Sequence, residues 1–333
     1  MPPVLQYDRG TRLRLTPPVD LAGPPQPPIV LNLLVPVPGL PAPPQASITF
    51  SVSKTLTPQP NGAQIRVANL TSTTRDRISG IVRRVVDWRS PAPVLNVDGV
   101  LRPGGNVFTS TLAGLCAVEL EAGYGGALGQ LFSGTVTRCR TVRSGADRVT
   151  ELTCTDGIGA SVAVANRSFT PGTPALAVVQ YLAEVLGLGL APTQGLAAFS
   201  GFVLHGGLHA HGDPLVGLTD VLGVVQLGWW IEDGQLWVLG DGETLPGQPV
   251  VVSAEPIPGA VRLRQEPDVL DQGALRIRAT LAPEIRLGHA VVVAGSDLRG
   301  TYRVEALVHS GNNRGGDFTT EAVLRSPVAA LGV

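Results

Sequence analysis

The sequence predicts a mainly β protein with a small α+β insert. Several short runs alternate between apolar and polar residues, as at Ile48, Phe50 and Val52, and this period of two is typical of half-buried strands. The 333 residues include 41 glycines and 29 prolines, which favours many short strands joined by turns. Only the middle of the chain changes to the 3.6-residue period of amphipathic helices.

Residues 1–160 predict an N-terminal β-barrel or sandwich. Alternation predicts strands at 9–15, 48–52 and 65–67, with turn residues at 58–62 between the last two. A meander follows over 117–156, with turns at Gly125-Gly126 and at 144–147. Thr71 or Ser72 is suited to cap a short helix, and 90–110 resembles an exposed hairpin. These strands are numerous enough to close into a barrel.

Residues 17–44 form a proline-rich segment. Eleven prolines there remove backbone donors and fix φ, so a central strand or helix cannot run through them. We expect a loop or arm in which Ile29–Val35 adds one strand. A PxxP ligand is a weaker alternative.

Residues 161–250 predict a helix-containing middle subdomain. A first helix is expected over 173–187, with Thr173 as its N-cap and Pro174 at its first position. A second is expected from the Asp213 cap to about residue 228. A hairpin then follows, with Trp229 and Trp230 on its first strand and a turn at Asp233-Gly234.

Residues 251–333 return to a period of two and predict a second β-barrel. Leu275, Ile277 and Ala279 alternate with polar residues, and Val304, Ala306 and Val308 do so later.

Composition narrows the functional class. The net charge is −1 with 15% charged residues, which argues against a nucleic-acid reader with a strongly basic face. The mean hydropathy of +0.22 favours surface buried against other subunits, and the alternative is that a glycine- and alanine-rich composition raises the average. No apolar run reaches the ~18 residues of a membrane helix, and the first residues do not resemble a signal peptide. The single lysine, Lys54, beside 24 arginines indicates codon bias. The three cysteines indicate buried free thiols.

The best enzyme-like cluster is formed by His205, His209 and His211. Zinc requires three or four such ligands in tetrahedral reach, so a metal-dependent hydrolase is an alternative function. Neighbouring glycines make a helical HxxxH arrangement unfavourable, and a loop or hairpin leading to Asp213 explains the same residues. The sequence holds neither a G-x-S-x-G elbow nor a P-loop. We therefore expect no enzyme activity, no bound metal and no cofactor.

Two groups of residues are candidate interfaces. Arg75, Arg77, Arg83 and Arg84 lie on the segment 71–89 and are suited to charge contacts between subunits, or to a solvated, salt-bridged face. Trp229 and Trp230 are expected to place one side of their hairpin in the core and the other against a partner. A carbohydrate-binding platform is the alternative for these tryptophans.

The order of motifs resembles the baseplate hub proteins of contractile phage tails, the Mu-like and related myophage hubs. The resemblance lies in ITFSVSKTLTPQPNGAQIRVANL, in AGYGGALGQLFSGTV, in the 213–236 pattern that ends in the WW…DG hairpin, and in GTYRV followed by HSG. Each motif alone is weak, whereas their order is moderately specific. In place of the acidic residue that follows the last glycine in many relatives, this chain has Asn312-Asn313-Arg314.

The resemblance implies a homotrimer whose two tail-tube-like β-barrel domains, 1–160 and 251–333, flank the middle subdomain 161–250. Such a ring adapts a sixfold tail tube to a threefold spike. It implies as partners a tail tube or tube-adaptor protein, a central spike and a tape-measure protein. DNA is expected only in transit, without specific binding, and no stable membrane insertion is expected. The location implied is the virion baseplate, assembled in the host cytoplasm. A siphophage-type tail-tip hub is a further alternative.

Overall fold

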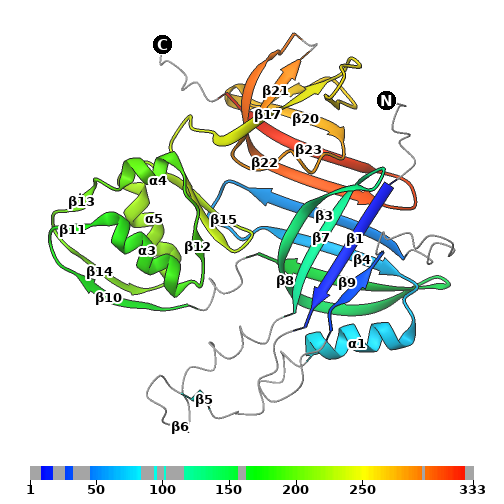
Figure 1. The fold of residues 1–333 in the computed structure, drawn as a ribbon, viewed down its shortest axis with the longest axis horizontal. Coiled ribbons are helices and arrows are strands. Elements are labelled where there is room, and N and C mark those ends of the chain that lie inside the picture. Colours follow the sequence, from blue (N-terminus) through cyan, green and yellow to red (C-terminus); the bar gives the residue numbers. More distant parts are fainter. Residues whose placement is uncertain are drawn as a thin grey trace.

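A computed structural model describes residues 9–17, 27–32, 46–83, 94–95, 101–102, 116–156, 163–294 and 297–326. The protein is mostly β with few helices, as expected (Figure 1). A single 14-stranded sheet contains strands from both ends of the chain, and the helices of the middle segment lie to one side of it. The prediction of a mainly β protein with few helices is therefore confirmed.

The first part of the sheet follows the predicted alternation. Its strands are β1 (Arg9–Thr16), β2 (Ile29–Leu31), β3 (Ser47–Thr55), β4 (Gly62–Ala68), β7 (Ala117–Tyr124), β8 (Ala127–Ser144) and β9 (Asp147–Thr155). Their order is β2-β1-β7-β8-β9-β4-β3. The long strand β8 pairs with β7 through its first half and with β9 through its second. Alternate residues such as Leu13, Ile65 and Leu120 are fully buried in one shared core.

Other elements of this part bear on earlier predictions. The helix α1 (Ser72–Arg83) begins after Thr71, whose Oγ1 accepts from the Thr74 amide at 3.2 Å. The short strands β5 (Val94–Leu95) and β6 (Leu101–Arg102) pair as a hairpin. The predicted strand 29–35 is observed as β2, and the remainder of the proline-rich segment lies largely outside the described residues. Cys116 and Cys154 are buried free thiols.

The middle part is built on its own apolar core. Its elements are β10 (Ala165–Phe169), β11 (Thr173–Pro174), α3 (Ala175–Val185), β12 (Gly189–Leu190), α4 (Gln194–Phe199), β13 (Val203–Leu204), β14 (Leu208–Gly212), α5 (Pro214–Gly223), β15 (Gly228–Glu232) and β16 (Gln235–Leu239). Helices α3 and α5 pack against each other and against the β15–β16 hairpin.

Sequence reasoning placed these helices but not all of their ends. Asp213 caps α5 as predicted, since its carboxylate accepts from the Leu215 amide at 2.9 Å, but α5 ends at Gly223 rather than near residue 228. Thr173 is not the cap of α3, which is a correction. It lies in β11 opposite Leu204, and its hydroxyl donates to the Thr170 carbonyl, so Pro174 takes the cap position without a side-chain bond.

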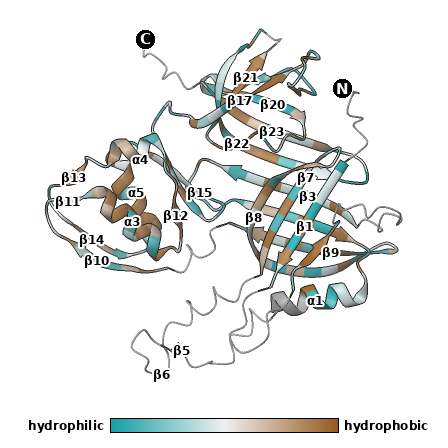
Figure 2. Cartoon of the chain, in the orientation of Figure 1, coloured by the Kyte–Doolittle hydropathy of each residue, from teal (hydrophilic) through white to brown (hydrophobic). Residues whose placement is uncertain are grey.

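The C-terminal part contains β17 (Leu245–Ser253), β18 (Val261–Arg262), β19 (Asp268–Val269), the 3₁₀ turn η2 (Asp271–Gly273), β20 (Leu275–Thr280), β21 (His289–Ala294), β22 (Gly300–Asn312) and β23 (Phe318–Arg325). Their buried residues form a third core. Figure 2 shows apolar residues alternating with polar ones along many of these strands.

Strand β22 joins the two ends of the chain. On one side it pairs with β23, and on the other it pairs first with β21 and then, from Ala306 to Asn312, with β3. The phenylalanines Phe50 and Phe318 meet edge to face at this join, with ring centroids 5.9 Å apart. The first and last strand groups are thus one continuous sheet.

The join leaves no room for a side chain at Gly311. A Cβ atom there would lie 2.4 Å from Cδ2 of Phe318 and 2.9 Å from Cζ of Phe50. We predict that Gly311→Ala lowers the free energy of unfolding by about 1–3 kcal/mol through overpacking. Gly201→Ala is the control, because a Cβ there meets no atom within 4 Å. Urea unfolding of both variants measures the effect, and equal stabilities would contradict this account of the join.

Candidate functional site

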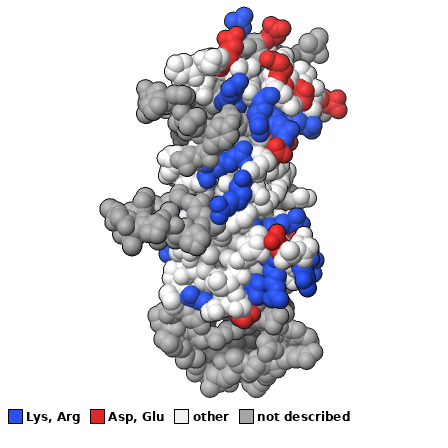
Figure 3. Space-filling model, turned by 90° about the vertical axis from the view of Figure 1, so that its right-hand side faces the viewer, with Lys and Arg blue, Asp and Glu red and all other residues white. Residues whose placement is uncertain are grey.

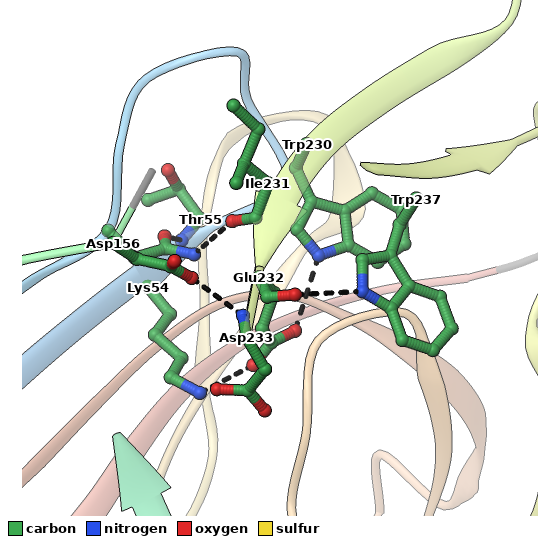
Figure 4. Close-up of polar contacts among 9 residues, drawn as sticks. Lys54, Thr55, Asp156, Trp230, Ile231, Glu232, Asp233 and Trp237 are labelled. Atoms are coloured by element: carbon green, nitrogen blue, oxygen red, sulfur yellow. Dashed lines mark hydrogen bonds and ion pairs between the residues drawn. The ribbon is translucent and has the colours of Figure 1, made fainter. Parts of the chain in front are cut away.

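The most elaborate polar site lies where the three cores meet, and we call it the junction. It is built from β3, the β15–β16 hairpin and the end of β9, and centres on Lys54, Glu232 and Asp156 (Figure 4). Lys54 is the only lysine in the sequence, yet its side chain is only 9% exposed. The alternation of β3 explains this burial, because Lys54 shares the inward face with Phe50 and Val52.

Glu232 compensates the buried lysine. Its Oε1 lies 2.5 Å from Lys54 Nζ, and its Oε2 accepts from the Trp230 indole at 3.2 Å. Its backbone carbonyl accepts from the Trp237 indole at 3.3 Å. Both carboxylate oxygens therefore have partners, as a buried charge requires.

Asn61 and Asp156 attach the hairpin to the first strand group. Asn61 Nδ2 donates to the Ile231 carbonyl at 2.9 Å, and its Oδ1 accepts from the Thr55 amide at 2.9 Å. Asp156 Oδ2 accepts from the Asp233 amide at 2.7 Å. Asp233 has φ 52° and Gly234 has φ 74°, so the predicted two-residue turn is the element held in place.

Burial dominates the electrostatics of the junction. It raises the pKa of Asp156 to about 6, with the neighbouring Asp233 and Glu232 charges adding to the rise and the Asp233 amide opposing it. Burial also raises the pKa of Asp233. His309, on β22, is buried beside Thr320 Oγ1 at 2.8 Å. Desolvation, aided by the Lys54 charge, lowers the pKa of His309 to about 3, so this imidazole is neutral at physiological pH.

The junction encloses a cavity of about 130 Å³, lined in part by Lys54, Glu232, Asp233, His289 and His309. Ligand pockets typically measure about 300–1,000 Å³, so this cavity is smaller than a typical ligand site. The polar groups of the junction hold the β15–β16 hairpin against β3 and the end of β9.

Two larger grooves lie on the surface, of about 510 Å³ and 490 Å³. The first runs between β3, β15 and β22 and includes Arg303. Its guanidinium already donates to the carbonyls of Gly240 and Glu243 and to the Glu305 carboxylate. The main charged group of this groove thus holds the chain's own backbone.

The structure places the three candidate histidines at the surface. His209 and His211 lie on the same face of β14, with parallel rings whose centroids are 5.9 Å apart. His209 Nδ1 is 2.6 Å from Ser168 Oγ. His205 follows β13 and is not joined to this pair by any contact among the described residues. Within the described ranges, no three His, Cys, Asp or Glu side chains are grouped as metal ligands.

The arginine candidates lie on or after α1. Arg77 is exposed and donates to the Pro27 carbonyl, and Arg75 is half-buried. Arg83 is the last residue of α1, and Arg84 lies outside the described residues. The structure therefore brings Arg77 against the proline-rich segment of its own chain.

The tryptophan candidates require a correction. Trp229 and Trp230 are 3% and 1% exposed within the single chain. The hairpin has cores on both faces, because Trp229 packs with the middle helices and Trp230 packs with the C-terminal strands. Neither ring offers a surface to a partner or a sugar. Trp230 stacks instead on the half-buried Trp237, with centroids 5.9 Å apart.

Comparison with known proteins gives structural neighbours only. No family model and no curated protein matches this sequence. The 43 kDa tail protein of prophage MuSo2 from Shewanella oneidensis matches 96% of this chain and 99% of its own, with TM-score 0.54 and 8% identity. The tail protein from Neisseria meningitidis MC58 matches 84% of this chain and 96% of its own, with TM-score 0.51 and 11% identity.

The fold is that of phage tail proteins. The resemblance inferred from the order of motifs is thus confirmed at the level of fold, although identity is only 8–11%. None of the helices in the described ranges is long and apolar enough to cross a membrane. Sequence reasoning missed the junction of this fold, although the inward position of Lys54 on β3 was the available signal.

We predict strong coupling between Lys54 and Glu232. Lys54→Met leaves a buried carboxylate without its cation, which should cost about 3–5 kcal/mol of unfolding free energy. Adding Glu232→Gln should restore part of that loss, because an amide oxygen still accepts from the Trp230 indole. A double-mutant cycle by urea unfolding measures this coupling. The exposed pair Arg14–Glu119 is the control and should couple by under ~1 kcal/mol. If the losses of unfolding free energy in the two single variants simply add, the predicted coupling between Lys54 and Glu232 is contradicted.

We also predict a pH dependence at Asp156. Its pKa is raised from 3.8 to about 6 in the folded chain, so the folded state binds this proton more tightly than the unfolded state does. The stabilisation by that proton is complete below pH ~4 and is lost as the pH rises through about 6. Asp156→Asn should therefore gain about 2–3 kcal/mol relative to the native protein between pH 4 and pH 7. Urea unfolding at a series of pH values measures this difference. If the unfolding free energies of the two proteins change with pH in parallel, this assignment is contradicted.

Proposed function

We propose that this protein is a structural component of a phage tail tip, the baseplate hub. The observation that carries the proposal is the end-to-end match to a prophage tail protein, which spans 96% of this chain and 99% of the other. A match over both strand groups and the middle segment supports a shared role better than a match to one domain. A structural role is also supported by the junction, whose charged groups hold the chain together.

In this proposal, residues 1–160 and 251–333 form two tail-tube-like β-barrels that flank the subdomain 161–250. The three apolar cores support this division. Leu281 and Phe318 belong to the first core, and Trp230 belongs to the third. Each of these side chains packs in the core of a segment other than its own. This packing favours units that move together as one rigid body.

The proposed assembly is a homotrimeric ring that adapts a sixfold tail tube to a threefold spike and lets DNA pass. Two tube-like units in each of three copies give six similar units around an axis. Among the described strands, β2 and β19 each pair with a neighbour on one side only. Open sheet edges pair readily with another chain, which supports self-assembly. The tube or tube-adaptor protein, the central spike and the tape-measure protein are the proposed partners in the virion.

We predict that the purified protein is a trimer. Light scattering after gel filtration should give three times the 34.6 kDa of one chain, and obligate interfaces of this kind bury more than ~2,000 Å². The mass should stay constant on dilution through the micromolar range. A monomer at every concentration would overturn the ring, whereas a stable hexamer or dimer would require another symmetry.

A further inference from the structure

The near-zero net charge of the chain conceals an uneven distribution. Residues 1–156 contain 15 lysines and arginines against ten acidic residues, whereas residues 157–240 contain one against five. On the side of the molecule shown in Figure 3, basic side chains form patches along much of its length, and most of the acidic ones lie near the top. The first strand group is thus the basic part of the protein.

One outward face of the sheet carries part of this excess of basic residues, and it has fewer acidic residues than arginines. The register places Asn312, Thr49, Arg66, Glu151 and Arg140 in one row across β22, β3, β4, β9 and β8. Side chains directly opposite one another in a sheet lie on the same face. Glu151 is the only acid of this row, and both of its oxygens are engaged, by Arg66 Nε at 3.1 Å and by Arg140 Nε at 2.5 Å.

A second row lies beside the first. It contains Ser51, Gln64, Thr153 and Arg138. Arg138 forms no ion pair among the described residues. The two rows meet in a groove of about 230 Å³ on β4, β9 and β8. This face, which we call the arginine face, therefore carries three guanidinium groups and only one carboxylate, which contacts two of them. The other side chains of the two rows are hydroxyls and amides.

Other outward faces differ in their charge balance. On β1 and β7, Arg12 pairs with Glu121 and Arg14 with Glu119, one to one. Arg278 on β20 lies near both Asp317, which directly precedes β23, and Glu321 on β23. Those faces are close to neutral, so the surplus of positive charge distinguishes the arginine face.

We propose that the arginine face binds the phosphate backbone of nucleic acid without regard to sequence. Guanidinium groups pair with phosphate in bidentate geometry, and neighbouring hydroxyls and amides donate further hydrogen bonds to phosphate oxygens. The two rows hold no aromatic side chain on which a base could stack. They also lack the aromatic and aliphatic anchors at the centre of most protein interfaces, which disfavours an acidic protein as the occupant.

This inference deepens the proposed function, since it assigns the side of the chain that faces DNA in transit. It implies weak, salt-dependent contact that a moving polyanion can make and break. Contact of this kind depends on the number of phosphates neutralised and falls steeply with salt.

The test is fluorescence anisotropy of a labelled 20-base-pair duplex titrated with the full-length protein at several salt concentrations. Arg138→Gln combined with Arg140→Gln should weaken binding at least tenfold and reduce the salt slope by about two. Arg262→Gln combined with Arg276→Gln removes the same charge from exposed positions of the C-terminal part and should leave binding within twofold of native. Circular dichroism and unfolding curves check that both variants fold.

A reciprocal variant makes the test sharper. Glu151→Gln removes the one acid of the arginine face and should tighten binding severalfold. Native-like binding by the Arg138/Arg140 variant, or an equal loss in the control variant, would overturn the inference. Stronger binding of poly-glutamate than of DNA, with the same arginine dependence, would also overturn it and indicate an acidic protein. A monomeric protein that still binds DNA through these arginines would refute the ring alone.

Discussion

The pairing of β3 with β22 is the constraint on which the rest of the structure depends. It makes neighbours of residues that lie about 250 positions apart, from Thr49 opposite Asn312 to Thr55 opposite Ala306. The pairing turns two strand groups into one sheet, and it places Lys54 on the same stretch of β3 that faces the hairpin. The same register also aligns the outward rows of polar side chains. The junction and the arginine face therefore lie on opposite faces of the same sheet.

The junction on the inner face combines a large desolvation cost with specific compensation. A buried ion pair is weak evidence of net stability, but the loss of one partner leaves an uncompensated charge. Lys54, Glu232 and the two indoles therefore favour one docking position of the hairpin over others. The neutral His309 keeps one further charge out of the same small volume. We infer that the junction selects one docking position of the hairpin more than it raises the free energy of unfolding.

Local patterns sufficed for much of the fold but not for its long-range pairing. Alternation gave β3, β4 and β20, and turn chemistry gave the hairpin at Asp233-Gly234. Nothing local specifies that β22 pairs with β3, because that choice depends on cores built from distant segments. The Thr173 cap was wrong because a strand pairing with Leu204 competes for that residue. Sequence alone predicts one free side for Trp229 and Trp230, because it does not reveal the second core across the hairpin. Composition alone explains the single lysine by codon usage, whereas the inward position of Lys54 on an alternating strand indicates a buried charge.

The burial of the sole lysine has a chemical consequence. Amine-selective reagents distinguish accessible ammonium groups from enclosed ones, and the folded chain exposes almost none of its single ε-amine. Arginine resists acylation, so the many surface cations of this protein are inert to such reagents. Acylation at position 54 therefore requires the hairpin to detach from the sheet, and its rate is a direct chemical record of that opening.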